Sequence, residues 1–181
     1  MRRGWCYCVA LIATAAVGFA AVGWAADVAT KPQVFKSWTL DCITPAAASA
    51  EAAPPKPYCI IHHENHPQGD PNKIALVART RFIGKERTRA MILLLPPEAE
   101  LQKGVVFSID KNASFKARIL SCNAHLCTSL FEISDVILKQ LKAGNQMTIG
   151  FSLTNGQPPV QMTVPLDGYS PAFDALQKTG L

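Results

Sequence analysis

Hydrophobic and polar residues alternate along much of this chain, which is the pattern of β-strands that bury one face. Between residues 34 and 42 the alternation places Trp38, Leu40 and Cys42 on a common face, and we expect that face to lie against the core. Asn155-Gly156 separates the last two such runs and is a strong hairpin signal, because both residues tolerate positive φ. Further strands are predicted at residues 58–64, 74–82, 89–95, 105–110, 115–122, 127–133, 146–153 and 160–165.

Two short helices interrupt the predicted strands. Ser134 is the expected N-cap of the first helix, with Asp135 against the positive end of the helix dipole and Gly144 as its stop. Ser170-Pro171 begins a second helix near the end of the chain. The pattern lacks the long helices that connect strands in a parallel sheet. The sequence therefore predicts an all-β fold, an antiparallel β-sandwich or partly closed barrel with two short helices.

The first residues have the pattern of an export signal. Arg2-Arg3 supplies a positive start, and residues 5–24 then contain no charged side chain. Small residues at Gly23 and Ala25 suit cleavage by a signal peptidase just before Ala26. The apolar run is also long enough to span a bilayer, so a retained anchor that associates with the membrane is the alternative.

Cleavage there gives a signal peptide, residues 1–25, and a single disulfide-stapled β domain, residues 26–181. Cys6 and Cys8 lie in the apolar run and are expected to leave with the signal. A domain of this length can bury a core without a metal. Its net formal charge falls from +5 to +3 when the two signal arginines are removed. This mild excess does not predict a nucleic-acid partner.

Four cysteines remain in the exported domain, Cys42, Cys59, Cys122 and Cys127. An oxidising compartment favours disulfides, and four cysteines allow three connectivities. Cys122 and Cys127 flank a short turn between predicted strands, where opposed residues come close enough to bond, so we predict this pair. Cys42 then pairs with Cys59. A reactive dithiol is the alternative, since His125 lies between two of the cysteines and an imidazolium lowers a thiol pKa.

Six features occur along the sequence in a characteristic order and spacing. They are the segment WTLDC at 38–42, Cys59, LLPP at 94–97, the spaced pair Cys122 and Cys127, the helical segment 138–141 and PLDGY at 165–169. Together they resemble the invasion-associated locus B family of Gram-negative bacteria, over about residues 34 to 176. The chain departs from that pattern at Glu98-Ala99, which follows the two prolines, and in a long Pro/Ala-rich insert after Cys42.

The resemblance implies an exported, disulfide-bonded β protein. In pathogens the family is linked to invasion of host cells and hence to virulence, and in many other bacteria its role is unknown. The resemblance transfers no catalytic residue and no cofactor to this chain. The two departures leave the expected fold unaffected, although both could alter a surface that recognises partners.

Enzyme motifs are sparse. The nucleophile-elbow, dinucleotide-binding, P-loop and HExxH zinc patterns are absent from the sequence. A Ser-x-x-Lys match at Ser108 and Lys111 falls at a strand-to-turn junction, whereas acyl-transfer enzymes place that serine at a helix start. We therefore predict neither a catalytic residue nor a cofactor.

Potential metal ligands gather at the end of the second predicted strand: His62, His63, Glu64 and His66. Imidazole and carboxylate groups bind zinc or copper. Adjacent side chains on a strand point to opposite faces, so His62 and Glu64 could share an ion while His63 faces away. We favour polar residues at a strand end and predict no metal, with a metal site as the alternative.

Basic residues follow two neighbouring strands and their turn: Arg79, Arg81, Lys85, Arg87 and Arg89. Period-two spacing places Arg79 with Arg81, and Arg87 with Arg89, on a common face. A solvated face whose cations discourage edge pairing is one interpretation. The other is a patch that recognises an anionic surface or an acidic partner.

These observations favour an exported, non-enzymatic protein of the periplasm or cell envelope, or a secreted one, that acts by surface binding. Its expected partner is an envelope or host-surface protein or an anionic surface. One alternative is an accessory subunit of a periplasmic or membrane assembly. Another is a periplasmic metal-binding protein or enzyme, which would need His62, Glu64 and Ser108 to meet in one pocket.

Overall fold

The structure is a computed structural model, and it describes residues 31–45, 55–66 and 75–181. The predicted signal peptide, residues 1–25, lies outside the described residues together with Cys6 and Cys8. So do residues 46–54, within the Pro/Ala-rich insert, and residues 67–74. Within the described ranges, no helix is both long and apolar enough to cross a bilayer.

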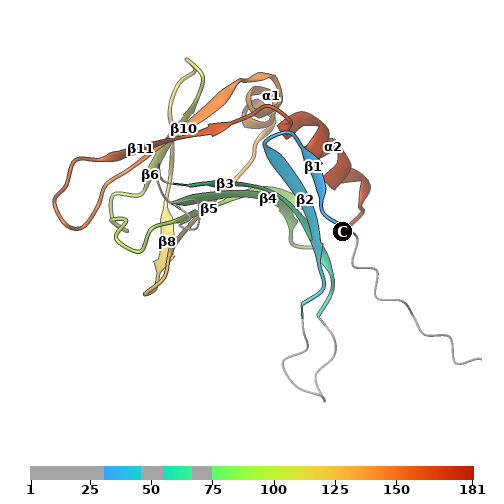
Figure 1. The fold of residues 1–181 in the computed structure, drawn as a ribbon, viewed down its shortest axis with the longest axis horizontal. Coiled ribbons are helices and arrows are strands. Elements are labelled where there is room, and N and C mark those ends of the chain that lie inside the picture. The colour runs from blue at the N-terminus through green and yellow to red at the C-terminus, as the bar shows by residue number, and fades with distance from the viewer. Residues whose placement is uncertain (1–30, 46–54, 67–74) are drawn as a thin grey trace, which may run out of the picture.

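The larger of two sheets contains seven strands in the order β1-β2-β3-β4-β5-β9-β8 (Figure 1). All neighbours are antiparallel, as the alternating sequence pattern predicts. The strands are β1 (Gln33–Phe35), β2 (Trp38–Ile43), β3 (Tyr58–Asn65), β4 (Leu76–Ile83), β5 (Thr88–Leu95), β8 (Ile119–Cys122) and β9 (Cys127–Glu132).

The smaller sheet contains four antiparallel strands in the order β11-β10-β6-β7. The strands are β6 (Val105–Ile109), β7 (Phe115–Ala117), β10 (Gln146–Phe151) and β11 (Val160–Pro165). The two sheets stay separate and do not close into a barrel. The prediction of an antiparallel, mostly β fold is confirmed.

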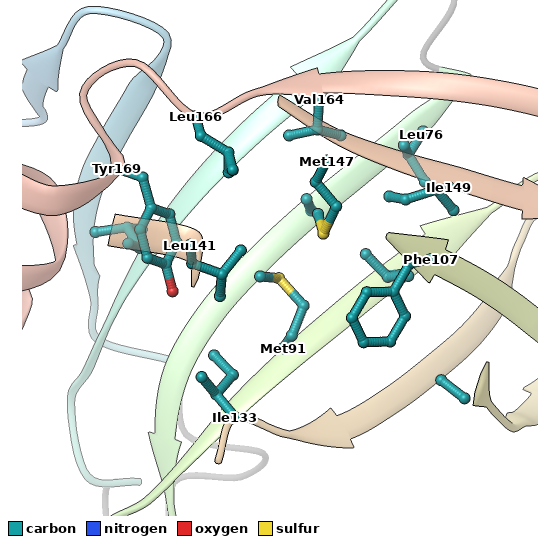
Figure 2. Close-up of a cluster of buried hydrophobic side chains, with 14 of the residues drawn as sticks. Leu76, Met91, Phe107, Ile133, Leu141, Met147, Ile149, Val164, Leu166 and Tyr169 are labelled. Atoms are coloured by element: carbon teal, nitrogen blue, oxygen red, sulfur yellow. The ribbon is translucent and has the colours of Figure 1, made fainter. Parts of the chain in front are cut away.

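One buried core lies between the sheets (Figure 2). Met91 of the larger sheet and Phe107 and Met147 of the smaller sheet are almost fully buried and point into the same space (Figure 2). The ring of Phe107 stacks on Phe131 of β9, with 4.2 Å between ring centroids. Apolar burial and ring stacking therefore join the two sheets directly.

Two helices complete the described fold, α1 (Asp135–Ala143) and α2 (Tyr169–Lys178). The Ser134 hydroxyl accepts a hydrogen bond from the backbone N–H of Ile137 at 3.3 Å, which confirms the predicted cap. Gly144 ends α1 as predicted. α2 packs against β1, β2 and β3 and covers that end of the larger sheet (Figure 1).

The strand predicted at residues 34–42 is in fact two strands. β1 and β2 form a tight hairpin around Lys36 and Ser37, with Phe35 paired to Trp38. Lys36 has φ +53°, a left-handed conformation that usually requires glycine or asparagine. A lysine gives no turn signal, so the alternation appeared continuous across the turn.

The strand predicted at residues 115–122 is also divided. Ala117 pairs with Val105 in the smaller sheet, whereas Ile119 pairs with Ser129 in the larger sheet. Arg118 stands between them, and the chain changes sheets there. Ala117 and Ile119 are both buried, so the period-two pattern continues through the change and hides it.

Residues 165–168 contact the hairpin that β1 and β2 form. The indole N–H of Trp38 donates to the carbonyl of Pro165 at 2.9 Å, and the Ser37 hydroxyl donates to the Asp167 carboxylate at 2.6 Å. Gly168, at φ +88°, sits so close to the Phe35 carbonyl that a Cβ atom would overlap it. These contacts, which we call the clasp, link the WTLDC and PLDGY segments of the sequence pattern.

The buried side chain of Tyr169 contacts the clasp from the core. Its ring meets Trp38 edge to face, with centroids 4.9 Å apart, and its hydroxyl lies 3.3 Å from the hydroxyl of Thr80. Both tyrosine and threonine are fully buried. Burial raises the pKa of the Tyr169 hydroxyl far above its ordinary value, and the hydrogen bond with Thr80 offsets part of that rise.

Candidate functional site

The four cysteines form two disulfides, Cys42–Cys59 and Cys122–Cys127, which are the pairs expected from the sequence. Each bond joins directly opposed residues of neighbouring antiparallel strands, β2 with β3 and β8 with β9. His125 lies in the exposed turn of the second hairpin. With all four sulfur atoms bonded, the dithiol alternative has no free thiolate to act as nucleophile.

The histidine cluster is divided by the faces of β3. His62 lies between two carboxylates, with Nε2 2.8 Å from Asp41 and Nδ1 3.7 Å from Glu64. The Nδ1–H of His63 points to the opposite face and donates to the carbonyl of Ser37 at 2.7 Å. His66 follows the strand at an exposed position. Within the described ranges, no three histidine, cysteine or acidic side chains are placed to share a metal ion.

Ser108 lies far from that cluster in the topology. It belongs to β6, opposite Thr148 in the smaller sheet, whereas His62 and Glu64 belong to β3 in the larger sheet. Lys111 occupies the exposed turn after β6. The structure therefore does not bring the candidate nucleophile, base and metal ligands into one pocket.

The five basic residues do not share one face. Arg79 and Arg81 of β4 pair with Ile92 and Ala90 of β5, so their side chains leave the sheet on the side away from the core. Arg89 pairs with Phe82 and projects on the opposite, inner side, where it forms an ion pair with Asp135 at 2.6 Å. In this register odd positions of β4 share a face with even positions of β5. Spacing along the sequence could not reveal this.

The turn between β4 and β5 carries the other two cations. Arg87 has φ +54°, and its guanidinium lies over the ring of Phe82, 4.4 Å from the centroid. Lys85 is exposed. The predicted pairing of Arg87 with Arg89 on a common strand face is therefore replaced by one turn residue and one inward-facing strand residue.

Arg79 and Arg81 belong to a larger surface on the side of the seven-stranded sheet that faces away from the core. We call this surface the outer face. It consists of Ile60, His62, Glu64, Val77, Arg79, Arg81, Ala90, Ile92, Leu94, Thr128, Leu130 and Glu132. Ile60, Val77 and Ala90 are buried on this side, although they do not belong to the core between the sheets.

The charged side chains of the outer face differ in the partners that they have. The Arg81 guanidinium lies over the ring of Tyr58, 4.1 Å from its centroid, and its Nε–H donates to the carbonyl of Phe82 at 3.3 Å. The Nε–H of Arg79 is buried without a hydrogen-bond partner. Among the described side chains, neither arginine forms an ion pair, whereas Asp41 and Glu64 both turn to His62. The face thus offers two guanidinium groups that lack a carboxylate partner, although Glu64 and Glu132 lie on the same face.

Three apolar side chains share the outer face with these arginines, and sequence reasoning missed them. Ile92, Leu94 and Leu130 are half-buried, and Ile92 and Leu130 lie in the same cross-strand row as Arg79. A signal was present, because residues 90–95 are apolar without interruption, and such a run predicts a strand with two apolar faces. The residues of the row are 13 and 38 positions apart, so no local pattern could join them.

Comparison with solved structures supports the fold. The crystal structure of invasion associated protein B from Bartonella henselae superposes with a TM-score of 0.66 at 18% sequence identity. The match covers 82% of this chain and 97% of the Bartonella chain. No curated protein sequence matched significantly. A family model described as invasion associated locus B (IalB) protein matches residues 38–177, so this chain belongs to the IalB family.

Proposed function

We propose that this protein is exported, is not an enzyme, and acts by binding an acidic partner protein through its outer face. The observation that carries the proposal is the combination, on one face, of two guanidinium groups that lack a carboxylate partner and three half-buried apolar side chains. Charge complementarity and apolar burial are the usual basis of protein recognition. The partner is a protein of the cell envelope or of a host-cell surface.

The disulfides support the location in this proposal. Disulfides persist in oxidising compartments, which for a bacterial protein means the periplasm, the cell surface or the medium. We therefore place the protein in the periplasm or envelope, or secreted from the cell. The name of the family adds a role in invasion to the proposal.

Crosslinking in intact cells tests the proposed contact. A photoreactive amino acid in place of Leu94 would capture whatever lies against the outer face. We expect a discrete crosslinked protein with the otherwise unchanged chain, and its loss when Arg79→Glu and Arg81→Glu are added. A matched control, Lys85→Glu with Lys111→Glu, makes the same charge change at exposed turns away from the face and should keep the product.

Two results would contradict the proposal. One is an identical crosslinked product with and without the charge reversal. The other is the absence of a protein product together with binding of the purified protein to anionic lipid vesicles, because the partner would then be a membrane surface.

A further inference from the structure

The strand β5 is apolar on both of its faces. Met91 and Leu93 lie in the core, while Ala90, Ile92 and Leu94 lie on the outer face. Strands of this kind are typical of sheets that are covered on both sides. The smaller sheet and α2 cover the inner side, whereas Ile92 and Leu94 are only half-buried. Ala90 is fully buried, so the uncovered area of the outer face, in the part of the chain that the structure describes, lies around Ile92, Leu94 and Leu130.

The uncovered area has the width of one α-helix. Arg79 and Arg81 on β4 border it on one side, and Glu132 on β9 borders it on the other. β4 and β9 lie on either side of β5, so they are two strand spacings, about 10 Å, apart. An α-helix with its side chains is about 10–12 Å across.

The length of the area also suits a short helix. The outer residues of β9, from Thr128 to Glu132, are not buried and span about 14 Å at the usual rise of a strand. A helix covers this length in about nine residues. Two to three helical turns would therefore bury Ile92, Leu94 and Leu130 together.

We propose that the outer face binds an amphipathic α-helix of the partner protein, with acidic residues along the flank that lies above β4. The apolar stripe of that helix covers Ile92, Leu94 and Leu130, and its carboxylates meet Arg79 and Arg81. Glu132 repels an acidic flank on the opposite side, so the charge pattern sets the orientation of the helix. This inference rests on the proposed function, because it names the kind of segment by which the acidic partner makes contact.

Two synthetic peptides of about 18 residues test the inference, each with leucines at i, i+3, i+4 and i+7. The first carries glutamates along one flank, and the second carries lysines at the same positions. Fluorescence anisotropy at low salt measures their binding to the oxidised full-length protein, and NMR shifts of the Ile92, Leu94 and Leu130 methyl groups locate it. We expect the acidic peptide to bind at least about tenfold more tightly than the basic peptide, at those methyl groups.

Charge reversal makes the test specific. Arg79→Glu with Arg81→Glu should invert the preference, so that the basic peptide binds more tightly. The control variant, Lys85→Glu with Lys111→Glu, makes the same change of charge outside the outer face. It should still bind the acidic peptide more tightly than the basic peptide, as the unchanged protein does. Leu130→Asn, an uncharged change of a half-buried residue, should weaken the binding of both peptides while the acidic peptide still binds more tightly. This variant keeps the test valid if the charge-reversed variant fails to fold.

The inference fails if the two peptides bind equally, if the control inverts the preference as the reversal does, or if the methyl shifts fall outside the outer face. It also fails if the protein alone forms a dimer through this face, since a second copy would then be the cover. In each case the proposed function still stands if the Leu94 crosslink is lost on charge reversal. If the Leu94 crosslink forms equally well after charge reversal, both the proposed function and this inference are wrong.

Discussion

Gly168 is the residue on which the clasp depends most closely. Its positive φ and its approach to the Phe35 carbonyl leave no room for a side chain. Gly156 also has positive φ, but it has open space around its Cα atom. The two glycines therefore separate the effect of backbone conformation from the effect of a close contact.

Gly168→Ala should lower the free energy of unfolding by more than about 2 kcal/mol, because it adds an overlap with Phe35 to the left-handed backbone conformation. At Gly156 only the left-handed backbone conformation opposes a side chain, so Gly156→Ala should lower the free energy of unfolding by about 1 kcal/mol. Urea unfolding at neutral pH measures both. Equal losses for the two variants would show that the close contact at Gly168 does not matter.

The buried hydroxyl of Tyr169 should make the free energy of unfolding depend on pH in alkaline solution. Its pKa is raised in the folded protein above the unfolded value of 10.0, so above pH 10 the folded state retains a proton that the unfolded state has lost. The contribution of this residue is complete below pH 10 and declines above it, with a limiting slope of about 1.4 kcal/mol per pH unit. Tyr169→Phe should lack this slope. Stability curves of the two proteins that stay parallel above pH 10 would contradict the burial of a neutral tyrosine.

At the scale of elements, the alternation of residues identified most strands, because most of them bury one face, and the end signals identified both helices. It failed where the chain turned without a turn signal, at Lys36, and where it changed sheets without losing its period, at Arg118. The register between β4 and β5 was equally hidden. It depends on how the two strands pair across a four-residue turn, and it decided which arginines belong to the outer face.

The two disulfides should differ in their contribution to stability. Cys42–Cys59 joins residues 17 apart, and Cys122–Cys127 joins residues 5 apart. Loop-closure entropy then gives about 3 kcal/mol for the first bond and about 2 kcal/mol for the second. Replacing each pair by alanines and measuring denaturant unfolding tests this order. A larger loss for the shorter loop would mean that contacts in the folded protein, rather than chain entropy, set the difference.

At the scale of the whole molecule, the two sheets share one core, in which Met91 faces Phe107 and Met147. Burial of one continuous cluster predicts that neither sheet is stable without the other. Two packed sheets were one of the two arrangements that the sequence left open, the other being a partly closed barrel. The pairing of distant strands into the outer face could not be predicted, because it is set by topology.

Unfolding should therefore be a single transition. Trp38 is the only tryptophan among residues 26–181, and it reports the clasp at one end of the larger sheet. Far-ultraviolet circular dichroism reports all strands. With the signal peptide removed, tryptophan fluorescence and circular dichroism should give the same midpoint in urea. Two separated midpoints would show that the clasp opens before the sheets part.

The clasp also constrains when folding can finish. Trp38 reaches its final surroundings only after Pro165 and Tyr169 have joined it, and Pro165 follows it by 127 positions in the chain. A nascent chain, or one threading through a membrane pore with its amino end first, cannot complete this part of its core until Tyr169 has emerged. The first hairpin stays without these partners for as long as the intervening residues are still being made or moved.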